Sequence, residues 1–176
     1  MANFLVGLAF TVTVAMASHQ IHAAEPDDRC ALYGGRTFAS SEVLRRLWTW
    51  VGSEMGVEGP EPVVCVVDLA LVSRMGGSAQ STTNALQVLA LYDRENRLVL
   101  MSSSPDVSDP VAQSVVVHEF VHHAQTLRGE RFACPQMAER HAYDMQARWL
   151  AGYDKSLAAD IGIGGLALVL LTNCPI

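Results

Sequence analysis

The sequence predicts a single α+β domain in which a short sheet packs against several helices. A Val-rich run at residues 63–72 and a pair of apolar runs within 86–103 suit strands, whereas three other segments show the apolar spacing of helices. At 176 residues, of which 50% are hydrophobic, the chain is long enough for one domain with a real core and short for two.

The first 23 residues are predicted to be a secretory signal peptide, followed by one domain at 24–176. They contain no Asp, Glu, Lys or Arg, and their apolar run is too short for a comfortable membrane span. An uncleaved anchor or a buried N-terminal helix is the alternative interpretation. Three cleavage positions are open, after Ala17, Ala23 or Ala24. After cleavage, no stable membrane insertion is expected.

The N-terminal half of the domain is predicted to hold a helix, a strand and a loop. Residues 40–56 carry an apolar stripe at helical spacing, and Ser40 or Ser41 can cap this helix. The run at 63–72 is rich in Val and suits a buried strand. Residues 73–84 are a loop by composition, and this loop can supply walls of a cleft.

The C-terminal half is predicted to begin with a β-hairpin at 86–103, whose strands join at a short polar turn. Asp109 suits an N-cap and begins a helix that ends near Gly129. A second helix is predicted at 135–152. The apolar segment at 160–171 is too short to span a bilayer and is predicted to be a buried helix, although its glycines can instead mark close packing or a break.

Charge and cysteine content narrow the class of protein. The net charge of −6 and the lack of a basic run make nucleic acid an unexpected partner. An even number of cysteines in an exported chain predicts two disulfides, and the lack of a CxxC pair disfavours a cysteine zinc site. Three connectivities are possible, and four buried free thiols are the alternative. The pairing that we favour is Cys30–Cys65 with Cys134–Cys174.

The stretch VVHEFVHHAQ at 116–125 contains the pattern HExxH. His118 and His122 are four residues apart, so a helix places both imidazoles on one face, where they can bind one zinc ion. Glu119 lies about 100° further round the helix and is predicted to act as general base on zinc-bound water. The alternative is a buried histidine pair held by backbone or carboxylate hydrogen bonds.

A catalytic zinc needs a third protein ligand, and the next helix offers Glu139 and His141. Glu139 is favoured because the packed face of that helix continues from it, whereas His141 points away from this face. Tyr143, one turn after Glu139, can donate to a tetrahedral oxyanion or can be a core tyrosine bonded to backbone. His123 is interpreted as structural or surface.

The residues HEFVH (118–122) and ERHAY (139–143), after the strand RLVLMS (97–102), resemble a minimal zincin metallopeptidase of the gluzincin kind. The chain is also similar to small bacterial exported proteins with a VHEFVHHxQ helix. The resemblance implies that His118, His122 and Glu139 bind zinc and that Glu119 is the base. It further implies a zincin-like fold in which 97–102 is an edge strand that pairs with extended substrate.

The sequence therefore predicts an exported, periplasmic or secreted zinc metallopeptidase with a peptide or protein as its substrate. Zn²⁺ is the expected cofactor, and Glu119 and Tyr143 are the expected catalytic residues. The alternative function is a non-catalytic envelope binding protein that retains a structural zinc or no metal.

Overall fold

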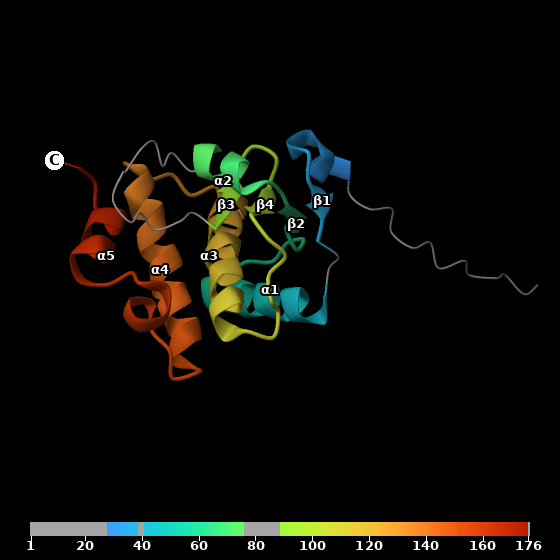
Figure 1. The fold of residues 1–176 in the computed structure, drawn as a ribbon. Helices are drawn as coiled ribbons and strands as arrows, with labels where there is room; N and C mark the ends of the chain where they lie inside the picture. The colour runs from blue at the N-terminus through green and yellow to red at the C-terminus, as the bar shows by residue number, and fades with distance from the viewer. Residues whose placement is uncertain (1–27, 39–40, 76–88, 176) are drawn as a thin grey trace, which may run out of the picture.

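The structure is a computed structural model that describes residues 28–38, 41–75 and 89–175 (Figure 1). The predicted signal peptide and most of the predicted loop at 73–84 lie outside the described residues. In chain order the elements are η1 (Asp28–Tyr33), β1 (Arg36–Thr37), α1 (Glu42–Met55), β2 (Val63–Val66), α2 (Leu69–Met75), β3 (Ala90–Asp93), β4 (Leu98–Met101), α3 (Pro110–Leu127), α4 (Pro135–Ala151), η2 (Leu157–Ile161) and α5 (Gly165–Thr172).

The described strands form a four-stranded sheet in the order β1-β2-β4-β3, which confirms the α+β prediction. β2 runs parallel to β4, whereas β1 and β3 are antiparallel to their neighbours. Every residue of β4 is buried. Since side chains alternate across a strand, Leu98 and Leu100 belong to one core cluster, and Val99 and Met101 belong to the cluster on the other face.

The larger core cluster lies between the sheet, α1, α3 and α4. Phe120, Val117 and Val121 of α3 have no exposed surface. Trp48 of α1 meets Phe120 edge to face, with ring centroids 6.0 Å apart. In Figure 1, α3 lies between the sheet on one side and α4 and α5 on the other. A helix that is apolar on most of its circumference becomes buried, and this explains the central place of α3.

The helices α1, α3 and α4 and the hairpin confirm the sequence predictions. Ser41 caps α1 by accepting a hydrogen bond from the Leu44 backbone nitrogen at 3.2 Å. Gly56 ends α1 with a left-handed φ of 63°, a conformation that costs glycine little. β3 and β4 pair across the predicted polar turn.

The prediction of one long strand at 63–72 is wrong in its second half. The strand ends at Val66, and α2 begins three residues later, at Leu69. The side chain of Asp68 accepts a hydrogen bond from the Ala70 backbone nitrogen at 2.7 Å, so this aspartate begins a helix where a strand was expected. Residues 73–75, predicted as the start of a loop, form the end of α2.

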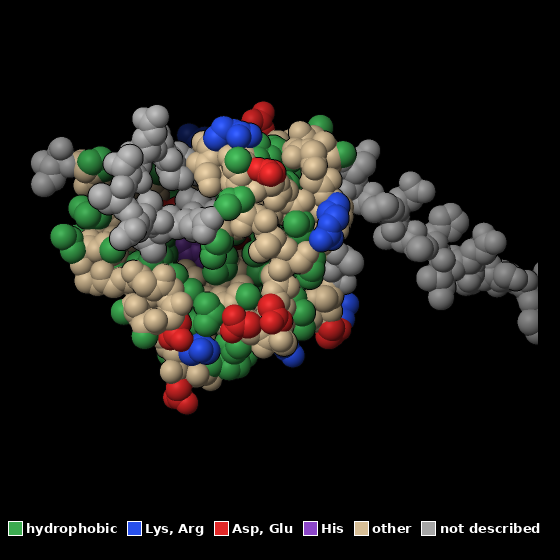
Figure 2. All heavy atoms as spheres, viewed as in Figure 1, with side chains coloured by type: hydrophobic (Ala, Val, Ile, Leu, Met, Phe, Trp, Pro, Cys, Tyr) green, Lys and Arg blue, Asp and Glu red, His purple; other side chains and the backbone are tan. Residues whose placement is uncertain are grey.

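The C-terminal segment forms a helix, as predicted, but it is not buried. Gly162, with a φ of 80°, ends η2, and α5 begins three residues later, so the glycines of this segment mark a break. The outward face of α5 exposes 72% of Leu166, 54% of Val169 and 67% of Leu170. Figure 2 shows hydrophobic side chains at the left of the molecule, where α5 lies in Figure 1.

The expectation that residues 97–102 form an edge strand is also wrong. β4 lies inside the sheet, because β2 pairs with it on one side and β3 on the other. Its backbone groups are therefore used within the sheet and are not available to a peptide. Within the described residues, β3 is the edge strand on this side.

Two disulfides join Cys30 to Cys65 and Cys134 to Cys174, which confirms the pairing that the sequence analysis favoured. The first lies in the smaller core cluster, with both cysteines buried. The second ties the start of α4 to the C-terminal residues. No helix in the described part of the chain is long and apolar enough to cross a membrane.

Candidate metal centre

The start of α3 is fixed by a capping residue, and this fixes the positions of the histidines along the helix. The carboxylate of Asp109 accepts hydrogen bonds from the backbone nitrogens of Val111 and Ala112 at 3.0 and 3.4 Å, and Pro110 occupies the first helical position. The apolar positions of α3 then pack into the core. The face that carries His118 and His122 turns toward α4, where the two imidazoles lie one turn apart.

Helix α4 brings the third candidate ligand. It begins after Cys134, with Pro135 at its first position, and packs along α3. Ala142 and Met145 fill the core side of α4. Glu139 lies near the start of the helix, about one turn before Ala142, and its carboxylate faces the two histidines.

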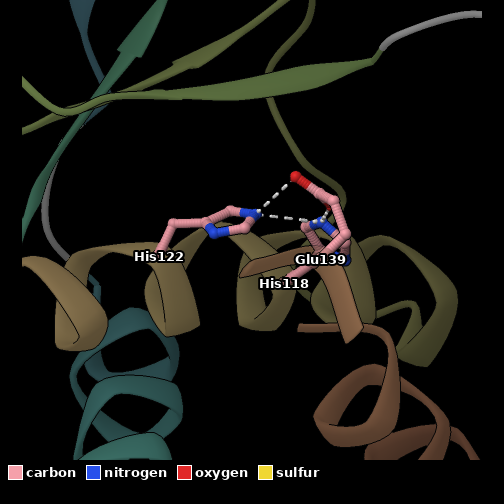
Figure 3. A group of neighbouring side chains, drawn as sticks. All are labelled: His118, His122 and Glu139. Carbon is pink, nitrogen blue, oxygen red and sulfur yellow. Dashed lines mark hydrogen bonds and ion pairs between the residues drawn. The ribbon is translucent and has the colours of Figure 1, made fainter. Parts of the chain in front are cut away.

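The three side chains converge, as Figure 3 shows. The Nε2 atom of His118 lies 3.0 Å from Oε2 of Glu139, and Nε2 of His122 lies 3.3 Å from Oε1. The two Nε2 atoms are 3.3 Å apart. The structure thus brings together the three residues that the sequence analysis proposed as ligands, each with one donor atom within 4.8 Å of the others.

These distances fit a zinc ion. Donor atoms about 2.0–2.2 Å from a tetrahedral centre are separated from one another by about 3.3–3.6 Å. The two Nε2 atoms, 3.3 Å apart, lie at the short end of this range, and each is 3.0–3.3 Å from one of the two carboxylate oxygens of Glu139. Two imidazole nitrogens and one carboxylate oxygen are also donors that zinc takes in proteins. The residues therefore fit the metal that the resemblance implies.

The electrostatics of the group favour a cation between its members. Burial opposes the charge on His122, but the hydrogen bond to Glu139 and the charges of Glu119 and Glu139 raise the pKa of His122 to about 9. Burial would likewise raise the pKa of Glu139, yet hydrogen bonds from His118 and His122 hold this pKa far below its usual range. The carboxylate therefore stays charged at neutral pH and attracts either a proton or a metal ion to the histidines.

The group remains open to solvent on one side. The side chain of Glu139 is 32% exposed, whereas those of His118 and His122 are 11% and 15% exposed. Histidine atoms are visible within a hollow of the face drawn in Figure 2. Glu139 is therefore the most accessible member of the group.

Glu119, the predicted base, is buried beside the group. It keeps 6% of its surface exposed, and burial raises the pKa of its carboxyl above the usual value. His118 and His122 lie close enough for their charges to oppose this rise. A backbone hydrogen bond from Tyr92 of β3 opposes it as well, so the edge strand and the candidate base are in direct contact.

Tyr143, the other predicted catalytic residue, packs against the first histidine. Its ring centroid lies 4.5 Å from that of His118, in an edge-to-face arrangement. Burial, followed by the charges of Glu139 and Glu119, raises the pKa of its hydroxyl, so the group stays protonated across the usual pH range. Within the described residues the hydroxyl has no hydrogen-bond partner, so the predicted bond to backbone is not seen there.

Residues 36–176 match a protein family described as a domain of unknown function, DUF6647. The chain belongs to the DUF6647 family. All of the candidate ligands and both candidate catalytic residues lie within the matched range. No curated protein and no solved structure matches the chain.

Two further histidines of the DUF6647 domain lie outside the group. His141 is partly buried on α4 and is not among the clustered donors of the described residues. His123 is 2% exposed and faces the core, which agrees with a structural role. Its Nδ1 lies 2.9 Å from the hydroxyl of Tyr92, and its Nε2 lies 3.2 Å from the Pro60 carbonyl oxygen. Burial lowers the pKa of this imidazole, so it is held neutral.

Two buried glutamines that contact the ligands were given no site role from the sequence. Oε1 of Gln146 lies 3.1 Å from Nδ1 of His118, and Oε1 of Gln125 lies 2.9 Å from Nδ1 of His122. Gln146 is two turns after Glu139 on the same face of α4, and this spacing was the signal that could have identified it.

Proposed function

We propose that this DUF6647 domain is an exported, zinc-dependent hydrolase of peptide bonds with a zincin-like active site. The observation that carries the proposal is the convergence of His118, His122 and Glu139 at separations of 3.0–3.3 Å beside the buried Glu119. Three protein ligands are the number that a catalytic zinc takes, because its fourth position is left for water or substrate. Both disulfides support folding in an oxidising compartment, such as the periplasm or the cell exterior.

In this proposal His118, His122 and Glu139 hold the zinc. When bound, zinc polarises the substrate carbonyl and lowers the pKa of water toward neutrality. The partial exposure of Glu139 leaves room for the substrate carbonyl to reach the donors.

Glu119 takes the proton of the attacking water and passes it to the leaving amine. Its buried carboxylate is a stronger base than an exposed one, because burial raises its pKa. The Tyr143 hydroxyl, which stays protonated, donates a hydrogen bond to the oxyanion that forms at the attacked carbonyl.

An extended peptide would bind along β3, the edge strand within the described residues. Backbone pairing with an edge strand provides affinity with little sequence selectivity. β3 contacts α3, and the Tyr92 backbone meets Glu119, so a peptide on this edge lies near the candidate base.

The proposal is tested by a Glu119→Gln variant. We expect hydrolysis of a fluorescently labelled unfolded protein to fall by roughly 10²–10⁴-fold, because the general base is lost. Zinc content, measured by elemental analysis of protein purified without a metal-affinity tag, should stay at about one ion per chain, as three protein ligands imply.

The matched control is Glu95→Gln, in the exposed turn between β3 and β4, which should retain activity. A wild-type chain that takes up no zinc after incubation and dialysis would overturn the proposal. A wild type that binds zinc but hydrolyses neither proteins nor peptides would favour the alternative of a zinc-binding envelope protein.

A further inference from the structure

We infer that Gln125 and Gln146 are positioning residues that fix which ring nitrogen of each histidine faces the metal. The inference rests on the site of the proposed function, although it concerns the protein with or without metal. Both glutamines are 3% exposed and each contacts one of the two histidines. In each contact a glutamine Oε1 meets a histidine Nδ1, and the hydrogen bonds around the glutamine decide which atom carries the proton.

Each glutamine belongs to a chain of hydrogen bonds, here called a relay, that links a histidine to a backbone carbonyl. The first relay runs from His118 through Gln146 and Ser114 to the carbonyl of Val111. The Ser114 hydroxyl lies 2.7 Å from the Val111 carbonyl oxygen, which can only accept, so the hydroxyl donates to it. The serine oxygen then accepts from Nε2 of Gln146 at 3.2 Å. The remaining amide oxygen of Gln146 faces Nδ1 of His118 at 3.1 Å, so this nitrogen must carry the proton.

The second relay is shorter and has the same direction. Nε2 of Gln125 donates to the Ala138 carbonyl oxygen at 2.9 Å. The amide oxygen of Gln125 therefore faces Nδ1 of His122 at 2.9 Å, and it can only accept. The oxygen and nitrogen of a glutamine amide can be exchanged by a flip of about 180°. The neighbouring acceptors settle which of the two atoms faces the histidine in both glutamines.

The two relays have one consequence. With a proton on each Nδ1, the Nε2 atoms are the nitrogens left to bind a cation, and these are the atoms that face each other and Glu139. Both relays also cross between α3 and α4. Gln146 of α4 bonds to α3, and Gln125 of α3 bonds to the backbone of α4 close to Glu139. They therefore fix the third ligand relative to the first two.

Zinc affinity of purified variants tests the inference, with a chromophoric chelator as competitor. We expect Gln125→Leu and Gln146→Leu each to weaken zinc binding by roughly 10–100-fold, the usual effect of losing a partner of a metal-bound histidine. Gln113→Leu is the matched control, because Gln113 is a buried glutamine of α3 that bonds to the Val107 carbonyl and contacts neither histidine. Wild-type affinity in both test variants would overturn the inference.

Carboxylate variants separate the two relays. Gln146→Glu should keep affinity within a few-fold of wild type, since its carboxylate still accepts from His118 and the Ser114 hydroxyl can turn to donate to it. Gln125→Glu should not restore binding, because a carboxylate oxygen would face the Ala138 carbonyl oxygen. Equal losses in Gln146→Glu and Gln146→Leu would contradict the role assigned to Gln146.

Long-range ¹H–¹⁵N correlation spectra of the wild type provide a readout that needs neither activity nor a variant that folds. Nδ1 of His118 and His122 should be protonated with zinc and without it. A bare Nδ1 on either ring would overturn the inference. If the wild type binds no zinc, the proposed function fails, whereas these spectra still decide whether the relays set the ring nitrogens.

Discussion

Three histidines lie within six residues of α3, and they serve different faces of one helix. His118 and His122 are four apart and meet Glu139 of α4. His123 is rotated by about 100° from His122 and bonds instead to Tyr92 and Pro60 in the interior. The density of histidine in this stretch therefore does not identify the residues of the candidate metal centre, whereas the spacing of four residues does.

The role of Tyr143 is tested by removing its hydroxyl. We expect Tyr143→Phe to lower kcat by roughly 10²–10³-fold if the hydroxyl stabilises the oxyanion, the range seen on loss of one such donor. The ring that packs against His118 is retained, so zinc affinity and unfolding temperature should stay near wild type.

Tyr153→Phe is the control for this change, since Tyr153 is 45% exposed and lies beyond the end of α4. Steady-state kinetics with elemental analysis check both variants. An unchanged kcat in Tyr143→Phe would leave this tyrosine as a packing residue.

At the scale of elements, the site lies between α3 and α4. These helices pack against each other, and α4 is also tied to the C-terminal residues. The disulfide Cys134–Cys174 attaches the C-terminal residues to the start of α4. A hydrogen bond of 2.8 Å from Arg140 to Asn173 adds to this attachment. The residue before α4 provides no side-chain cap, so the disulfide contributes order to the turn that precedes Glu139.

The two disulfides should differ in what their loss does. They close segments of 35 and 40 residues, for which loop entropy alone gives about 4 kcal/mol each. Replacing both Cys30 and Cys65 by Ala should cost more unfolding free energy than this, because that pair is also part of the core. Replacing Cys134 and Cys174 by Ala should cost less unfolding free energy than the loss of the first disulfide. It should, however, weaken zinc binding.

Urea denaturation and zinc competition on the two double variants measure these effects, and each variant is the control for the other. Zinc affinity that falls only in the Cys30 and Cys65 variant would contradict the role assigned to the second disulfide.

At the scale of the whole molecule, zinc would join helices whose ligands lie far apart in sequence, so its binding should be coupled to global stability. Free zinc at about 1,000 times Kd should add about 4 kcal/mol to the free energy of unfolding. For a domain of this length, the melting temperature should then rise by on the order of 10 °C.

Differential scanning calorimetry with zinc, and then with a chelator, measures this rise. The variant Glu139→Ala should show little of it, because one of the three ligands is absent. A rise of equal size in Glu139→Ala would indicate that zinc binds elsewhere.

The sequence by itself determined the features that depend on neighbours a few residues apart. The capped starts of α1 and α3, the shared face of His118 and His122 and the hairpin at β3 and β4 all follow from local geometry and hydrogen bonding. The strand expected from the Val-rich run ends at Val66, and Asp68 then accepts a hydrogen bond from the Ala70 backbone nitrogen at the start of α2.

Only the tertiary structure decided which distant groups meet. His118 and Glu139 are 21 residues apart, and His118 and Gln146 are 28 apart, so no periodicity could pair them with certainty. The place of β4 inside the sheet also depends on its pairing with β2, which comes more than 30 residues earlier in the chain. The exposure of α5 depends on how much apolar surface its neighbours can cover. Each of these outcomes is set by packing between elements, which the order of residues within an element does not encode.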